Sequence, residues 1–297
     1  MQEDVSEFIK KVNVGDYKTL ARAISLVENE HPLSENILLS LKPDNRTPVI
    51  GITGPPGAGK STLVNALAQE LSSNGKRIAI LAIDPSSPFN KGSLLGDRIR
   101  MSARFNDPNI YIRSIASRGN LGGLSEKTIE IADVLRSAPF DIILIETVGV
   151  GQSEIDIVGL ADFTIVVLVP ESGDEIQHVK SGIMEIADIY IINKADREGA
   201  DIFASKLIGM LKQKGVKIPV LKIIADKSIG VYKLLQFITE FQQSDNLSNL
   251  SLLTEKAWRL IQQKRMNNVD KASLKQKLIE ANKEDFFNLY RFINDHY

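Results

Sequence analysis

The chain has 297 residues, of which 43% are hydrophobic and 25% charged, and its formal net charge at pH 7 is -1. This balance is typical of a globular protein with a sizeable core, and it supplies no global positive charge for binding nucleic acid or an anionic membrane. The sequence has no cysteine, which excludes disulfides, Cys-ligated zinc, iron–sulfur clusters and a thiol nucleophile.

Residues 1–46 are predicted to form an N-terminal helical extension. Their apolar residues recur at three- and four-residue spacings, which is the periodicity of an amphipathic helix. Asp16 or Thr19 is placed to cap the second helix of this segment. The first residues lack the apolar core of a signal peptide, and apolar runs such as 163–170 are far shorter than the ~20 residues of a membrane helix. We therefore expect a cytoplasmic protein.

Residues 47–245 are predicted to form a domain of alternating strands and helices. Six almost continuously apolar runs have the pattern of strands covered on both faces, and they lie at 48–53, 77–83, 141–146, 163–169, 189–193 and 220–225. Amphipathic stretches of helical length separate several of them, at 61–74, 124–137 and 174–187. This alternation predicts an α/β fold with a doubly wound, mainly parallel sheet. After residue 245 the strand-like runs stop, and 246–297 is predicted to form two or three polar helices.

A glycine-rich loop follows the first strand-like run and matches the phosphate-binding pattern G-x-x-x-x-G-K-[ST] without a mismatch. Its glycines allow backbone N–H groups to wrap around phosphate oxygens, and the helix that opens near Lys60 directs its positive dipole end at the same place. Lys60 is expected to reach the β- and γ-phosphates as a catalytic group, and Ser61 to coordinate Mg²⁺. The predicted nucleotide-binding residues of the loop are Gly54, Pro55, Pro56, Gly57, Ala58, Gly59, Lys60, Ser61 and Thr62.

A second motif, N-K-x-D at 193–196, follows the fifth strand-like run and is predicted to select the base. The carboxylate of Asp196 can accept from both N1–H and the 2-amino group of guanine, whereas adenine has neither donor there and would leave the acid unpaired. Asn193, Lys194 and Asp196 are therefore predicted to bind the guanine of GTP or GDP, with the backbone of Ala225 at the base edge. The alternative for this motif is a polar helix cap after a strand.

An acidic residue ends the third strand-like run, beside the predicted phosphate loop. Glu146 is placed to reach Mg²⁺ through water, and the N–H of Gly149 to sense the γ-phosphate. A valine follows Gly149, and its side chain cannot orient a water by hydrogen bonding. We therefore predict slow intrinsic hydrolysis unless Gln152, or a partner, supplies that role.

Two further acids are candidate metal ligands. Asp84 ends the second strand-like run, so we expect it near the metal and the γ-phosphate, with a turn cap as the alternative. For Asp97 the residues alone leave a metal ligand and a solvated loop acid equally open. The acidic run 171–175 is either a helix cap or a switch that senses a partner.

Five segments together resemble the methylmalonyl-CoA mutase-associated GTPases, the MeaB/ArgK-like proteins, and they are 51–62, 82–101, 118–125, 146–154 and 193–196. The resemblance implies a GTPase core with a C-terminal helical arm that forms a homodimer. It implies a chaperone for an adenosylcobalamin-dependent acyl-CoA mutase, in which GTP binding and hydrolysis are coupled to cofactor loading and protection. It also implies that Asp84, Asp97 and Glu146 form an acidic metal cluster with Ser61, and that 171–180 is the mutase-sensing switch.

Two other functions would use the same phosphate loop. A metal-insertion GTPase chaperone is disfavoured by the lack of cysteine and by only three scattered histidines. A small-molecule kinase is disfavoured by the N-K-x-D motif. Neither a nucleic-acid nor a membrane partner is predicted.

Overall fold

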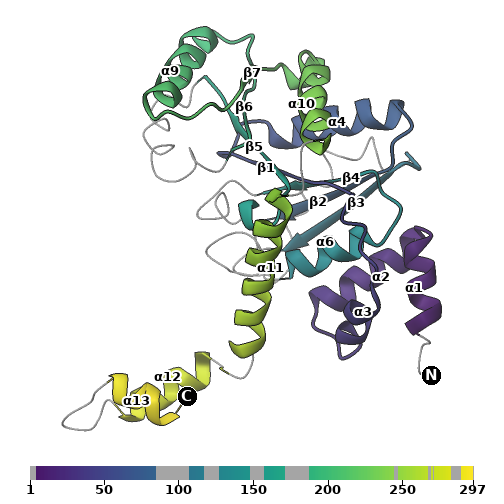
Figure 1. Cartoon of the computed structure of the whole chain (residues 1–297), viewed down its shortest axis with the longest axis vertical. Helices are drawn as coiled ribbons and strands as arrows, with labels where there is room; N and C mark the ends of the chain where they lie inside the picture. The colour runs from purple at the N-terminus through teal and green to yellow at the C-terminus, as the bar shows by residue number, and fades with distance from the viewer. Residues whose placement is uncertain are drawn as a thin grey trace. The chain divides into compact units, whose positions relative to one another are not determined.

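In the part of the chain that the computed structural model describes, seven parallel strands form the central sheet (Figure 1). The structure describes residues 5–84, 107–116, 127–147, 157–170, 187–243, 247–266, 269, 271–281 and 289–296. The strands lie in the order β3-β2-β4-β1-β5-β6-β7, and the neighbouring strands pair in parallel. Their bounds are β1 Val49–Thr53, β2 Ile78–Asp84, β3 Ile110–Ala116, β4 Ile142–Glu146, β5 Phe163–Leu168, β6 Ile189–Ile192 and β7 Val220–Lys222. The α/β fold predicted from the sequence is confirmed.

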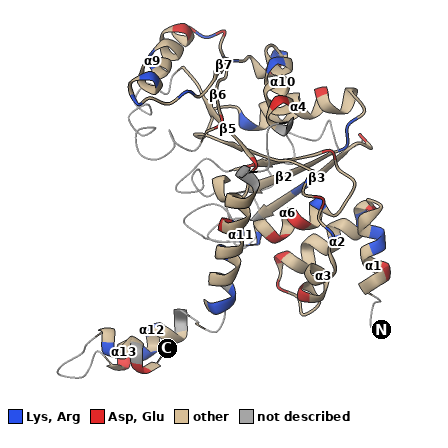
Figure 2. Cartoon of the chain, in the orientation of Figure 1, with Lys and Arg blue, Asp and Glu red and all other residues tan. Residues whose placement is uncertain are grey.

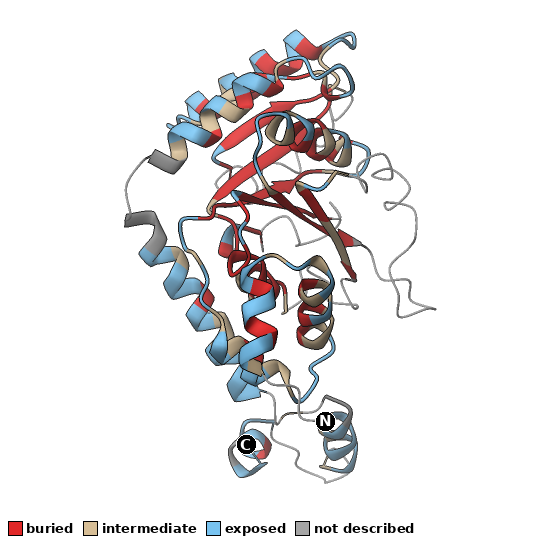
Figure 3. Ribbon diagram, turned by 90° about the vertical axis from the view of Figure 1, so that its right-hand side faces the viewer, coloured by how far each residue is buried: buried red, intermediate tan, exposed pale blue. Residues whose placement is uncertain are grey.

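Helices cover both faces of this sheet. α4 (Lys60–Ser73) and α10 (Val231–Gln243) pack on one face, over alternate strand residues such as Ile52. α9 (Ala200–Gln213) packs on the opposite face, over residues such as Leu168. The central strands β1, β4, β5 and β6 are buried throughout (Figure 3), which is why their sequences are nearly continuous apolar runs.

Three N-terminal helices pack against one another, and the second of them also contacts α6 and β3. The bounds of these helices are α1 Val5–Asn13, α2 Tyr17–Glu28, α3 Ser34–Ser40 and α6 Thr128–Arg136. Asp16 caps α2 as predicted, since its Oδ1 accepts a hydrogen bond from the Thr19 backbone N–H at 2.8 Å. The Tyr17 hydroxyl donates to the Pro108 carbonyl at 2.8 Å, which joins this layer to the segment that enters β3.

One strand of the sheet, β3, was not predicted. Its sequence, IYIRSIA, carries Arg113 at the centre, so it lacks the continuous apolar run of the other strands. β3 lies at the edge of the sheet, where Arg113 Nη2 reaches Glu28 Oε2 of α2 at 3.1 Å. The arginine is thus paired across 85 residues of sequence, which a local pattern does not reveal. The predicted helix 174–187 lies almost wholly outside the described residues.

The C-terminal part is helical, in α11 (Leu247–Met266), α12 (Lys271–Ala281) and α13 (Leu289–His296). The chain divides into two compact units, Met1–Leu252 and Leu253–Tyr297. Basic and acidic residues are interspersed on the same helices (Figure 2). Within the described parts of the chain, no helix combines the length and the apolarity needed to cross a bilayer. The domain boundaries predicted after residues 46 and 245 stay predictions.

Candidate nucleotide site

The predicted phosphate loop joins the carboxyl end of β1 to the first turn of α4. Gly54 has φ 137°, and a Cβ placed on it would lie 2.1 Å from the Val167 carbonyl oxygen of β5. Gly59 is the N-cap of α4 with φ 85°, and a Cβ there would lie 2.3 Å from Nδ2 of Asn193. Both positions therefore require glycine, for close approach as well as for backbone conformation. The loop follows a strand and opens a helix, which is the context that the motif needs.

Lys60 is buried and folded back over this loop. The whole residue is only 6% exposed, and its Nζ donates to the carbonyls of Gly54 at 2.8 Å and Pro55 at 3.0 Å. The ammonium group thus lies at the N-terminus of α4, where backbone dipoles favour a bound anion.

A serine and a glutamate meet at the carboxyl ends of β1 and β4. The Ser61 hydroxyl donates to Glu146 Oε1 at 2.6 Å, and Glu146 is 7% exposed. Hard oxygen ligands of this kind suit Mg²⁺, which proteins usually hold through one or two side chains together with phosphate and water. The two residues therefore fit the predicted metal, although among the described residues no group of three or more His, Cys, Asp or Glu is gathered around one point.

The end of β4 is tied to the end of β1 by a second contact. The Thr147 hydroxyl donates to Thr53 Oγ1 at 2.9 Å, and both threonines are almost fully buried. The Thr147 backbone N–H also donates to the Ile52 carbonyl at 3.0 Å. The residue that precedes the phosphate loop is therefore linked directly to the residue after Glu146.

Asn193 joins the two predicted motifs. It is 2% exposed, its Nδ2 donates to the Ala58 carbonyl of the phosphate loop at 2.9 Å, and its Oδ1 accepts from the Ala225 N–H at 3.1 Å. Lys194 has φ 54°, and its Nζ donates to the Gly57 carbonyl at 2.8 Å. The structure thus brings together the phosphate loop, the N-K-x-D segment and the β7–α10 connection. The sequence predicted these residues as nucleotide contacts and did not predict that Asn193 holds the three segments together.

Asp196 is exposed at the outer end of the same cluster. Lys227, the last residue of the 3-10 helix η4 (Ala225–Lys227), lies with its Nζ 2.9 Å from Asp196 Oδ2. The hydrogen bond from Lys227 holds the pKa of the Asp196 carboxyl below its ordinary value and raises the pKa of Lys227. Asp196 is therefore ionised at neutral pH, which is the state that accepts two hydrogen bonds from guanine. Sequence reasoning missed Lys227, because nothing local marks it.

Some predicted site residues lie outside the described part of the chain. These are Asp97, Gly149 and Gln152, together with the segment 171–180. Asp84 is the last residue of β2, beside β4 in the sheet, and its side chain is also outside the described set. Their roles stay predictions.

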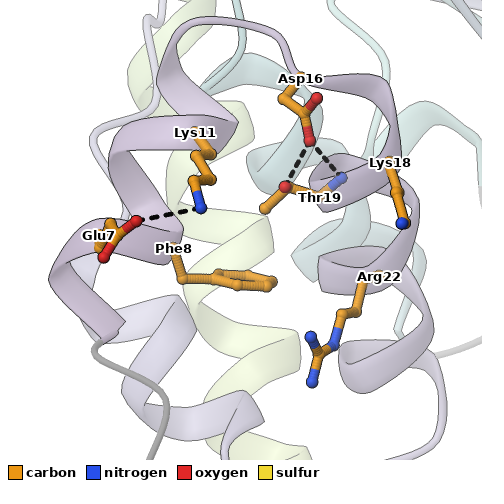
Figure 4. Close-up of a pocket in the computed structure, with 7 residues that line it drawn as sticks. All are labelled: Glu7, Phe8, Lys11, Asp16, Lys18, Thr19 and Arg22. Carbon is orange, nitrogen blue, oxygen red and sulfur yellow. Dashed lines mark hydrogen bonds and ion pairs between the residues drawn. The ribbon is translucent and has the colours of Figure 1, made fainter.

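A separate cavity of about 640 Å³ lies between α1 and α2 (Figure 4). Its lining residues are Glu7, Phe8, Lys11, Asp16, Lys18, Thr19 and Arg22. Three of its charged side chains are already engaged within the lining, since Lys11 Nζ lies 3.1 Å from Glu7 Oε1 and Asp16 caps α2. None of the predicted site residues contributes to this cavity, so we do not assign it to the nucleotide.

Replacing Asn193 with alanine is expected to weaken GDP binding while the protein stays folded. The change leaves the buried Ala225 N–H and Ala58 carbonyl without the partner that joins them. An unsatisfied buried group usually costs about 1–3 kcal/mol, which the two loops relieve by moving apart. Restoring their alignment on GDP binding then lowers the affinity by up to that amount, roughly 5- to 150-fold. Isothermal titration calorimetry with GDP measures this loss of affinity. Asn74→Ala at the other end of α4 is the matched control, and an unchanged affinity in Asn193→Ala would contradict the assignment.

One family model and several known proteins match this chain. The family model described as Methylmalonyl Co-A mutase-associated GTPase MeaB matches residues 20–283. A putative GTPase of Pyrococcus horikoshii is 43% identical over 249 residues, covering 81% of this chain and 78% of the relative. The mitochondrial methylmalonic aciduria type A homolog of Mus musculus is 37% identical over 251 residues, covering 77% of this chain and 60% of the relative.

Among solved structures, that of a LAO/AO transport system kinase superposes with a TM-score of 0.69 at 25% identity, covering 99% of this chain and 97% of the other. The resemblance stated from the sequence segments is therefore confirmed. The match spans the sheet, the phosphate loop and the N-K-x-D segment. This chain belongs to the methylmalonyl Co-A mutase-associated GTPase family and is a P-loop GTPase that binds guanine nucleotide.

Proposed function

We propose that this GTPase is an Mg²⁺-dependent chaperone of an adenosylcobalamin-dependent acyl-CoA mutase of the methylmalonyl-CoA mutase type. In this proposal GTP binding and hydrolysis are coupled to loading and protection of the mutase cofactor, and the protein acts in the cytoplasm. The observation that carries the proposal is the family match over residues 20–283, since the name of that family states an association with the mutase. The name of the mouse relative refers to methylmalonic aciduria, which supports the same partner.

In this proposal, three groups of residues bind the phosphates, the metal and the base of the nucleotide. Lys60 and the N–H groups of the phosphate loop hold the phosphates and oppose the negative charge that develops during transfer. Ser61 and Glu146 would hold Mg²⁺, which would supply neutralisation of the phosphate charge. Asn193 aligns the base-reading segment with the phosphate loop, so that Asp196 and the Ala225 backbone meet guanine while the phosphates are held.

The proposed homodimer is supported by exposed apolar side chains in the C-terminal unit. Trp258 is 58% exposed and Ile261 47% exposed on α11, and Tyr290 is 83% exposed on α13. Large apolar side chains left in water on adjoining helical turns are typical of surfaces that another chain covers.

The partner is tested by GTP hydrolysis with and without a purified adenosylcobalamin-dependent acyl-CoA mutase. We expect slow basal turnover that the mutase accelerates, and no acceleration when Lys60→Ala replaces the wild-type protein. Turnover that is indifferent to the mutase would contradict the partner and keep the GTPase. Stoichiometric metal binding that is independent of nucleotide would favour metal insertion instead, and phosphate transfer to a metabolite would favour a kinase.

A further inference from the structure

A lysine outside the known motifs contacts the predicted guanine-reading acid. Lys227 Nζ lies 2.9 Å from Asp196 Oδ2, although the two residues are 31 positions apart in sequence. Their side chains are 56% and 41% exposed, so water surrounds the pair and the lysine is not needed to neutralise a buried acid. The contact lies outside the hydrophobic core and places a cation on the acid that is predicted to read guanine.

The backbone on both sides of this contact is hydrogen-bonded. Ile224 and Ile229 exchange two backbone hydrogen bonds of 3.1 Å, and the Lys227 N–H donates to the Ile224 carbonyl at 3.1 Å. The Ala195 N–H, next to Asp196, donates to the Ile223 carbonyl at 3.1 Å. The short loop that carries Lys227 is thus closed on itself and joined by a backbone hydrogen bond to the segment that carries Asp196.

We propose that Lys227 is a positioning residue for guanine recognition, which rests on the proposed role of Asp196 in reading the base. A carboxylate has about four lone-pair sites on its two oxygens, and guanine uses one on each, for N1–H and for the 2-amino group. Lys227 occupies a further site on Oδ2, which restricts the rotation of the carboxylate. The plane of Asp196 is thereby set before the base arrives, and the cost of ordering it on binding is reduced.

This role predicts a change in base discrimination, which a purely structural role does not. Guanine and hypoxanthine share N1–H, and hypoxanthine lacks the 2-amino group, so inosine diphosphate uses one bond to Asp196 where GDP uses two. Lys227→Met removes the charge and keeps most of the apolar stem. We expect it to weaken GDP binding about two- to five-fold, the range of exposed ion pairs. Binding of inosine diphosphate weakens less, so the preference for GDP falls.

The experiment measures dissociation constants for GDP and inosine diphosphate by titration calorimetry in wild type, Lys227→Met and Lys227→Arg. Arginine should restore the preference for GDP. Lys222→Met is the matched control. Lys222 is the last residue of β7 and forms an exposed ion pair with Asp201 of α9. Equal weakening of both nucleotides would show that Lys227 only attracts the phosphates and would overturn the inference, as would unchanged binding of both.

Asp196→Ala separates this inference from the proposal on which it rests. If Asp196 reads guanine, this variant loses most of the preference for GDP whatever Lys227 does. Loss of preference in Asp196→Ala combined with a normal preference in Lys227→Met would refute the role of Lys227 alone. An unchanged preference in Asp196→Ala would refute the guanine-reading role itself, and the inference with it.

Discussion

Replacing Lys60 with alanine is expected to lower the rate of GTP hydrolysis about 10²- to 10³-fold, the cost typical of removing one preorganised group that opposes transition-state charge. The lysine is buried at the start of α4 and directed over the phosphate loop by two carbonyls of that loop. No other cation among the described side chains contacts the carbonyls of Gly54 and Pro55, so none replaces it there. Single-turnover hydrolysis with saturating GTP measures the chemical step.

Lys76→Ala is the matched control for Lys60→Ala. Lys76 is an exposed lysine whose Nζ lies 3.0 Å from Asp141 Oδ1. The two residues lie just before the starts of β2 and β4, whereas the phosphate loop follows the carboxyl end of β1, at the opposite end of these parallel strands. We expect wild-type hydrolysis from it. A Lys60→Ala protein that hydrolyses GTP within about threefold of wild type would contradict the assigned role, on the same scale of transition-state cost.

The largest expected effect on stability comes from Arg136→Met. Arg136 is 6% exposed; its Nη2 donates to Asp162 Oδ2 at 2.5 Å and its Nε to the Thr47 carbonyl at 3.2 Å. The same Asp162 oxygen accepts from the Val49 N–H at 2.7 Å, at the start of the strand that leads to the phosphate loop. Removing one partner of a buried ion pair leaves the other uncompensated, and we expect a loss of about 3–5 kcal/mol of unfolding free energy.

Urea unfolding followed by circular dichroism measures this loss, and two further variants interpret it. Arg136→Met combined with Asp162→Leu should recover part of the stability, because the uncompensated charge is gone. Arg46→Met is the control, since the Arg46 side chain is 90% exposed in its ion pair with Asp44 and no shift of the midpoint is expected. Equal midpoints for Arg136→Met and wild type would show that the pair is dispensable.

The sequence by itself determined most of the sheet and the position of the nucleotide loops. Six strands were predicted within one to three residues of their observed bounds, because a strand covered on both faces must be apolar at every position and that pattern is local. The phosphate loop and the N-K-x-D segment were also readable locally. Glycine and a fixed spacing are required there by backbone geometry, as Gly54 and Gly59 show.

Only the tertiary structure decided which residues meet. β3 was not predicted because Arg113 interrupts the apolar pattern of the strand. Glu28, the ion-pair partner of Arg113, is remote in sequence. Asn193 reaches the Ala58 carbonyl across 135 residues, and Lys227 meets Asp196 from another loop. These contacts form because parallel strands bring the loops at their carboxyl ends to one edge of the sheet, so distant polar side chains become neighbours there. A local pattern specifies an element and its buried face, whereas the partners of its polar groups depend on the order of the strands.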